Sequence, residues 1–273
     1  MKKIRTIKIY QFVILIIIAS LVACFDPQEG CLEINASNFD PTADENCCCI
    51  FPDFKVQIAQ RYGEDIFNLD SFYFNNLNQA FAIKNVQFYL SGFELIDENN
   101  NALLANEKLE VYWNNNGTIQ VDSIKDDILL VNRSFVEEII GTVDMPNDFQ
   151  AVELYFGLTD TASCVIADSI ASTHPMGPKI DSLFIYPDGK YNFAIIEIED
   201  LNGQVYNLEL QSNAPRLISL DYFYSVANGD NAAIPLIVDY REWLADVNFN
   251  TMTIQQIADK IVINISSSFK IFE

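Results

Sequence analysis

Short stretches in which apolar and polar residues alternate fill most of the chain after Phe51. Every second side chain of Phe54–Ile58 is apolar, which is the pattern of a strand with one face in a core. Many short strands joined by loops at close intervals are typical of a sandwich. We therefore predict an all-β fold, an antiparallel β-sandwich with a few short helices. The same reasoning predicts further strands at Leu109–Trp113, Ile128–Val131, Ala151–Phe156, Tyr191–Ile198, Val205–Leu210, Leu217–Tyr224 and Ile234–Tyr240.

One predicted strand changes its pattern at Gly92. Apolar side chains occupy alternate positions in Val86–Leu90, and they resume on the opposite parity in Phe93–Leu95. A glycine at such a point is typical of a β-bulge or of a close approach of two backbones.

Turn and cap residues predict where strands are connected and where short helices begin. Asn202-Gly203 predicts a tight turn that joins Tyr191–Ile198 and Val205–Leu210 as a hairpin. Short helices are expected at Arg241–Val247 and at Ile254–Ala258, the second with Thr253 as its N-cap. Because we see no linker of low complexity after Pro52, residues 51–273 are expected to form one domain.

The first 24 residues have the order of a bacterial lipoprotein signal. Basic residues come first, an apolar run at Phe12–Ile18 follows, and the segment ends in Leu21-Val22-Ala23-Cys24. This spacing predicts that residues 1–23 are a cleaved signal peptide and that Cys24 receives diacylglyceryl and acyl chains such as palmitate. Several acyl chains on one residue give stable anchoring, so the expected partner is a membrane and the expected location is the cell envelope. The predicted anchor lies in the outer membrane, on its periplasmic or its surface face. An uncleaved N-terminal anchor, or an ordinary signal that precedes a cysteine by chance, is the alternative.

The charge and the histidine count exclude two classes of function. The chain has 16 basic and 38 acidic residues, a net charge of −22 and a pI near 4.2. Such a field repels phosphate backbones, so the chain has no nucleic-acid partner. Because the chain contains a single histidine, His174, a metal centre with several imidazole ligands is also excluded.

Cysteines gather between the predicted lipid anchor and the predicted domain. Export favours disulfides, so we expect Cys31 to pair with one member of the run Cys47-Cys48-Cys49. Adjacent cysteines pair only with strain, which leaves at least one thiol free. A copper or zinc thiolate cluster is the alternative.

Residues 24–50 are expected to act as a Cys-rich, acidic spacer. From Gly30 to Cys49 the sequence resembles a small cysteine-bounded module found near the N-terminus of Bacteroidetes surface lipoproteins. A weak calcium site is an alternative to a solvated acidic turn, because oxygen donors lie close together at Asn38, Asp40, Asp44 and Glu45.

From Phe51 to Glu273, the order of segments resembles the MbnP-like copper-binding domain, a family named after a periplasmic protein encoded beside methanobactin genes. The segments that carry the resemblance are Phe54–Ile58, Phe81–Leu95, Val152–Asp160, His174-Pro175-Met176, Lys190–Phe193, Ile237–Tyr240 and Ile257–Lys260.

The resemblance implies an exported β-sandwich that binds copper. In some members a partner di-haem enzyme oxidises a tryptophan to kynurenine, but this chain has Leu183–Tyr186 where the family has its tryptophans. The strand Val205–Leu210 also lacks the histidines of the family. What remains is a reduced candidate site for Cu(I), with an imidazole nitrogen from His174 and sulfur from Met176 or Cys164. An ordinary loop histidine beside a packed methionine is the alternative reading, as is a buried, inert Cys164. The predicted partners are a TonB-dependent transporter of the outer membrane or a di-haem peroxidase.

Enzymatic motifs are absent from the sequence, and we predict that the chain is not an enzyme. The acid pairs Asp126-Asp127 and Glu197 with Glu199 are chance products of an acidic chain in this reading. The alternative function is a β-sandwich lipoprotein that has kept the family's shape without its metal and binds a protein partner or a glycan.

Overall fold

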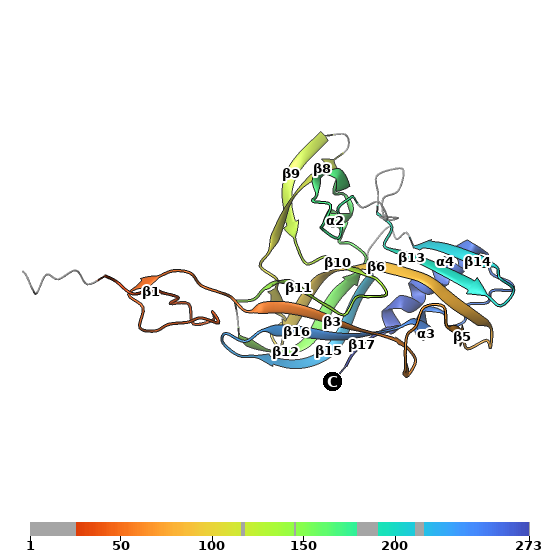
Figure 1. Cartoon of the computed structure of the whole chain (residues 1–273), viewed down its shortest axis with the longest axis horizontal. Helices are drawn as coiled ribbons and strands as arrows, with labels where there is room; N and C mark the ends of the chain where they lie inside the picture. The colour runs from red at the N-terminus through yellow and green to blue at the C-terminus, as the bar shows by residue number, and fades with distance from the viewer. Residues whose placement is uncertain (1–25, 116–117, 145, 179–190, 211–215, 273) are drawn as a thin grey trace, which may run out of the picture.

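The computed structural model describes residues 26–115, 118–144, 146–178, 191–210 and 216–272, and most of its strand residues belong to two packed sheets (Figure 1). The predicted β-sandwich is confirmed. Cys24 and the segment Leu183–Tyr186 lie outside the described residues. In the part of the chain described, no helix has the length and apolarity needed to cross a membrane.

The larger sheet is built around β6 (Ala80–Asp97). Its main order is β14 (Val205–Leu210), β13 (Ala194–Asp200), β6, β12 (Asn147–Phe156) and β15 (Arg216–Val226). Three short strands also pair with β6: β5 (Phe72–Phe74), β7 (Ala102–Leu104) and β10 (Leu129–Val131). All of these pairs are antiparallel, so the 18 residues of β6 hold most of the sheet together.

The second sheet has the order β11 (Glu137–Thr142), β3 (Asp53–Tyr62), β16 (Ala232–Asp239) and β17 (Phe269–Ile271), with β4 (Asp65–Ile66) on β3. The β3–β16 pair is parallel, whereas the other pairs of this sheet are antiparallel. A separate hairpin of β8 (Lys108–Asn115) and β9 (Thr118–Lys125) stands away from both sheets in Figure 1.

The bulge expected at Gly92 is present in β6. Gly92 has a φ of +64°, and the pairing with β12 shifts between Ser91 and Glu94. As a result, Leu90 and Phe93 are both buried although they have opposite parity. Because the side-chain period of a strand is two, one inserted position moves the apolar set to the core again.

Short helices follow the strands, as expected. They are α2 (Asp160–Ser163), α3 (Tyr240–Trp243) and α4 (Ile254–Asn264), with single 3₁₀ turns at η1 (Ala167–Ser169) and η2 (Ile265–Ser267). Thr253 caps α4 in a capping box with Gln256, so the predicted helix start is confirmed, although α4 runs further than Ala258. The helix expected at Arg241–Val247 is one turn only and ends at Trp243. The hairpin around Asn202-Gly203 is confirmed by the pairing of β13 with β14.

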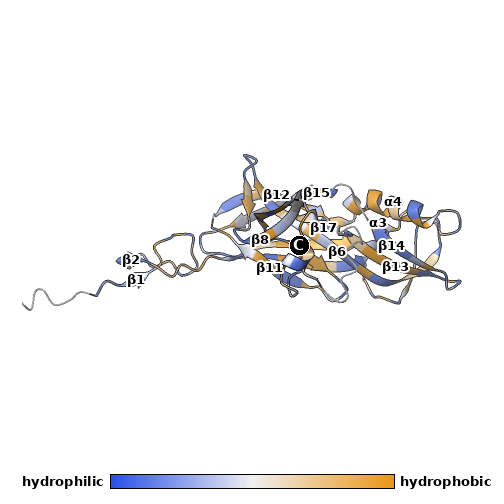
Figure 2. Cartoon of the chain, turned by 90° about the horizontal axis from the view of Figure 1, so that it is seen from above, coloured by the Kyte–Doolittle hydropathy of each residue, from blue (hydrophilic) through white to orange (hydrophobic). Residues whose placement is uncertain are grey.

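Aromatic side chains join the two sheets, because the ring of Phe156 in β12 lies 6.4 Å from the ring of Phe269 in β17. Trp243 of α3 makes edge contacts with Phe88 of β6 and Phe156 of β12, at ring-centroid distances of 5.3 and 5.7 Å. Its indole N–H donates to the Ser268 hydroxyl at 2.7 Å, so this buried ring has no unsatisfied polar atom. Hydrophobic residues follow β6 and its neighbours in Figure 2, where the N-terminal arm is mainly hydrophilic. The core therefore lies between the sheets and does not depend on the arm.

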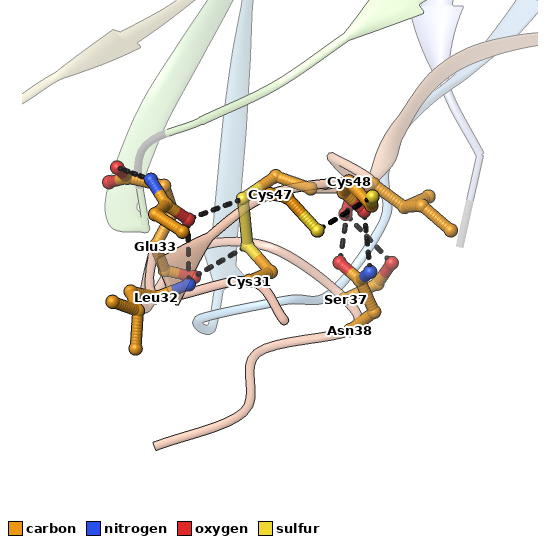
Figure 3. Close-up of a disulfide and its surroundings, with 10 residues drawn as sticks. Cys31, Leu32, Glu33, Ser37, Asn38, Cys47 and Cys48 are labelled. Atoms are coloured by element: carbon orange, nitrogen blue, oxygen red, sulfur yellow. Dashed lines mark hydrogen bonds between the residues drawn. A yellow bond between two sulfur atoms is a disulfide. The ribbon is translucent and has the colours of Figure 1, made fainter. Parts of the chain in front are cut away.

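The N-terminal arm is a separate, disulfide-linked module. Its strands β1 (Glu29–Gly30) and β2 (Glu45–Asn46) pair in parallel, and Cys31 is bonded to Cys49 (Figure 3). The expected pairing of Cys31 with one of the clustered cysteines is thus confirmed. In the acidic turn of this module, the Asp40 carboxylate accepts hydrogen bonds from the Thr42 amide and hydroxyl. These bonds lower the pKa of Asp40.

We expect Gly157→Ala to destabilise the sandwich much more than Gly203→Ala. Gly157 has a φ of +104°, and an added Cβ would lie 2.5 Å from the Phe193 ring, whereas at Gly203 (φ +76°) the nearest atom is 3.9 Å away. Both changes carry the left-handed backbone penalty of about 1–2 kcal/mol, and overpacking adds about 1–3 kcal/mol at Gly157 alone. Urea denaturation, followed by tryptophan fluorescence, measures the free energy of unfolding of both variants. Equal losses of stability would contradict the packing argument.

Candidate functional site

Two buried tyrosines hold the loop that carries His174. The Tyr89 hydroxyl donates to the carbonyl of Pro175, and the Tyr191 hydroxyl donates to the carbonyl of Met176, both at 2.9 Å. Burial raises the pKa of both phenols, so they remain protonated donors at neutral pH. The loop is therefore fixed against the larger sheet by groups that come from its central strand β6 and from the segment before β13.

Both ring nitrogens of His174 have partners. Nε2 lies 2.8 Å from Oδ1 of Asp126, and Nδ1 accepts the backbone N–H of Met176 at 3.1 Å. The His174 side chain is 13% exposed and that of Asp126 is 32% exposed, so the pair lies near the protein surface and not in the hydrophobic core. This arrangement fixes the ring orientation and places a carboxylate next to it.

Asp126 is positioned by its neighbour Asp127. The Asp127 carboxylate is buried and accepts the backbone N–H of Phe93 at 3.0 Å, directly after the bulge at Gly92. Burial raises the pKa of Asp127, and the backbone N–H groups of Gly92 and Phe93 oppose this shift. Consecutive residues point in opposite directions along an extended chain, so Asp127 faces the sheet and Asp126 faces His174.

A pocket of about 330 Å³ opens beside the His174–Asp126 pair. We call it the His174 pocket. Its wall contains three acidic residues, one hydroxyl and one imidazole, together with apolar side chains and backbone from β10 and β11. The lining residues are Glu107, Asp126, Ile128, Leu129, Glu138, Ile139, Ile140, Gly141, Thr142, His174 and Pro175.

Glu107 is locked to β11 on one side of the pocket. Its carboxylate accepts the Thr142 amide at 2.7 Å and the Thr142 hydroxyl at 3.0 Å, and its backbone carbonyl accepts the Asp126 amide at 3.1 Å. Gly141 makes room for this, because a Cβ there would overlap the Glu107 carboxylate. The pocket therefore combines a rigid acidic wall with an oriented imidazole, and this arrangement favours cations and hydrogen-bond donors as ligands.

The three residues predicted to bind copper are not presented as one ligand set. Met176 is fully buried and belongs to the hydrophobic core, whereas His174 faces the pocket. Cys164 is exposed at the C-terminal end of α2, so the alternative of a buried, inert thiol is wrong. Among the residues that the structure describes, no group of three or more His, Cys, Asp or Glu side chains is arranged to hold a metal ion.

The acid pairs noted in the sequence have separate surroundings. Asp126 and Asp127 point to different partners, as described above. On β13, Glu199 forms an ion pair with Lys84 at 3.3 Å. Sequence reasoning missed Glu107 and Thr142, because they lie on different segments and no local motif links them to His174.

Fold and site together define a mainly antiparallel β-sandwich with an acidic, single-imidazole pocket between β10 of its larger sheet and β11 of its smaller sheet. The chain belongs to the MbnP family, because the sequence model of that family matches residues 52–261, more than half of the chain. The resemblance noted from the sequence is confirmed.

A solved structure, MbnP from Methylosinus trichosporium, is similar with 12% identity and a TM-score of 0.42, over 70% of this chain and 76% of that chain. No curated protein matches the chain.

The hydrogen bonds of His174 predict which nitrogen carries its proton. Since Nδ1 accepts an N–H, the neutral ring should be protonated at Nε2 and donate to Asp126. Because the chain has one histidine, long-range ¹⁵N–¹H NMR of the protein without a histidine tag reports this ring alone. We expect the Nε2–H pattern in the wild type and a mixture of tautomers in Asp126→Ala. A dominant Nδ1–H pattern in the wild type would show that the loop geometry is wrong.

Proposed function

We propose that this MbnP-family protein is an exported, lipid-anchored accessory protein that binds a cation in the His174 pocket at the cell envelope. The observation that carries the proposal is the oriented His174–Asp126 pair on a wall that also contains Glu107 and Glu138. A chain with a net charge of −22 adds a long-range field that attracts cations to such a pocket.

Copper is the cation that the family suggests. The predicted ligand set of His174, Met176 and Cys164 does not form a copper site in this fold, because the Met176 side chain lies in the core. An imidazole with carboxylates does suit a divalent transition ion, and His174 Nε2 and Asp126 are the atoms that would bind it. Binding there requires the ion to replace the hydrogen bond between these two residues.

The role we propose is binding and not catalysis. Glu199 is engaged with Lys84, and Asp127 is engaged with the backbone of β6. One member of each acid pair thus has a structural role. A metal-handling accessory protein at the outer membrane would pass its ion to a TonB-dependent transporter or serve a di-haem peroxidase.

A second candidate, docking of a protein partner or glycan without metal, is favoured by the β8–β9 hairpin. Tyr112 and Val121 lie opposite each other, and Ile119 lies two residues further along the same face. Their exposed fractions are 43%, 57% and 64%, while Val111 and Ile124 of the other face are buried. An exposed apolar face of this kind is common in interaction surfaces.

The copper proposal predicts one equivalent of copper on the protein purified without chelators or tags. We expect His174→Ala to lose it and Cys164→Ser to keep it, as measured by elemental analysis. Met176→Ala is unsuitable as a test, because truncation of a buried methionine costs about 2–5 kcal/mol of stability. Circular dichroism shows whether His174→Ala is folded. Wild-type protein without copper, or a folded His174→Ala variant that keeps it, would favour the second candidate.

The lipid anchor is tested by metabolic labelling with an alkyne-bearing palmitate analogue. We expect labelled wild type in the membrane fraction, because the acyl chains on Cys24 anchor the chain. Cys24→Ser should abolish the label, and Cys164→Ser is the matched control that should keep it. An unlabelled wild type with an intact N-terminus in the soluble fraction would refute the anchor.

A further inference from the structure

Cys47 and Cys48 are free thiols whose sulfur atoms face each other in the N-terminal module (Figure 3). Their Sγ atoms lie 2.7 Å apart. The chain thus places two cysteines in contact next to the formed Cys31–Cys49 disulfide, without including them in it.

The backbone at Cys48 is what makes this contact. Adjacent side chains of an extended segment point to opposite sides, so two neighbouring thiols normally face apart. Cys48 instead has a φ of +58°, in the left-handed region that residues other than glycine rarely adopt. Backbone strain of this kind is stored where the surrounding structure enforces it.

Hydrogen bonds on both sides enforce the conformation. The Asn38 amide donates to the Cys48 carbonyl and its side-chain oxygen accepts the Ile50 amide, both at 2.8 Å. The Cys47 amide donates to the Gly30 carbonyl at 2.9 Å. The sulfur contact is therefore built into the module and is not a chance approach of two mobile side chains.

We propose that Cys47 and Cys48 are a redox-active pair that closes reversibly into a second, vicinal disulfide. The oxidant is another disulfide, of a small thiol or of a thiol-exchange protein. One thiolate attacks it and releases one thiol, and the second thiolate then attacks the mixed disulfide and releases the other. Two thiol protons and two electrons leave the cysteine pair and reappear in the two thiols that are released.

The two disulfides of the module would differ in how readily they open. Adjacent Cα atoms lie about 3.8 Å apart, below the usual range of about 4.4–6.8 Å for bonded cysteines, so a vicinal bond is strained. Cys31–Cys49 has a Cα separation of 4.8 Å, and Cys31 is buried. Exchange would begin at the exposed Cys48, because its hydrogen bond with Cys47 raises the pKa of the Cys47 thiol to about 11. Strained and exposed disulfides are the labile ones in proteins.

Thiol counting after equilibration in glutathione buffers tests the proposal on the purified full chain. N-ethylmaleimide traps free thiols, and the tryptic peptide that ends at Lys55 contains Cys31 and Cys47 to Cys49 together. The same peptide contains Cys24, so the chain used in this experiment carries Cys24→Ser, which leaves four cysteines in the peptide. We expect this peptide to gain two maleimide groups in one step as the buffer becomes more reducing. The next two should appear only at a glutathione ratio at least about tenfold more reducing.

Two variants assign the steps. Cys48→Ser should abolish the first step, leave one maleimide on Cys47 throughout and keep the second step, whereas Cys164→Ser should change neither. The proposal is overturned if all four thiols appear in a single step, or if oxidised molecules are joined as dimers. It is also overturned if both thiols react in the fully oxidised buffer, including the case in which elemental analysis finds zinc or copper bound to them. None of these results depends on the His174 pocket.

Discussion

The bulge in β6 is the constraint on which both the core and the pocket depend. A strand of 18 residues that kept one parity would turn half of its apolar side chains away from the core somewhere along its length. Gly92 prevents this, because its φ of +64° inserts a position and returns Phe93 and Leu95 to the interior. An alanine there would meet the Tyr155 ring at 2.7 Å, so both the conformation and the space require glycine.

The same bulge builds one wall of the pocket. Inserting a residue frees the backbone N–H of Phe93 from the ladder, and the buried Asp127 carboxylate accepts it. Burying a carboxylate costs free energy unless hydrogen-bond donors replace the water around it. The freed N–H of Phe93 is such a donor, and it fixes the position of Asp127. Asp126 then faces the opposite way and meets His174. The imidazole is thus oriented by a chain of contacts that begins at a glycine in the central strand.

The sequence predicted the features that depend on local patterns. It missed contacts between residues far apart in the chain and the direction in which side chains such as Met176 point. The parity switch at Gly92, the cap at Thr253 and the Asn202-Gly203 turn follow from residues a few positions apart. The short strands β5 and β7 were missed because three residues carry no periodicity. His174 was singled out, but Asp126 lies 48 positions away and nothing in the sequence links them. Met176 was assigned as a ligand because composition does not show that a side chain two residues from His174 turns into the core.

The described donors that bind soft metals are kept apart from the pocket. Met176 is buried, Cys164 is exposed elsewhere, and the thiols of Cys47 and Cys48 belong to the N-terminal module. As metal ligands, the pocket offers one imidazole nitrogen and several carboxylate oxygens. The sheets are held by β6 and by the aromatic contacts of Trp243, none of which lines the pocket. Ligand residues can therefore change without loss of the fold, which is how a chain with a single histidine can still have the architecture of its family.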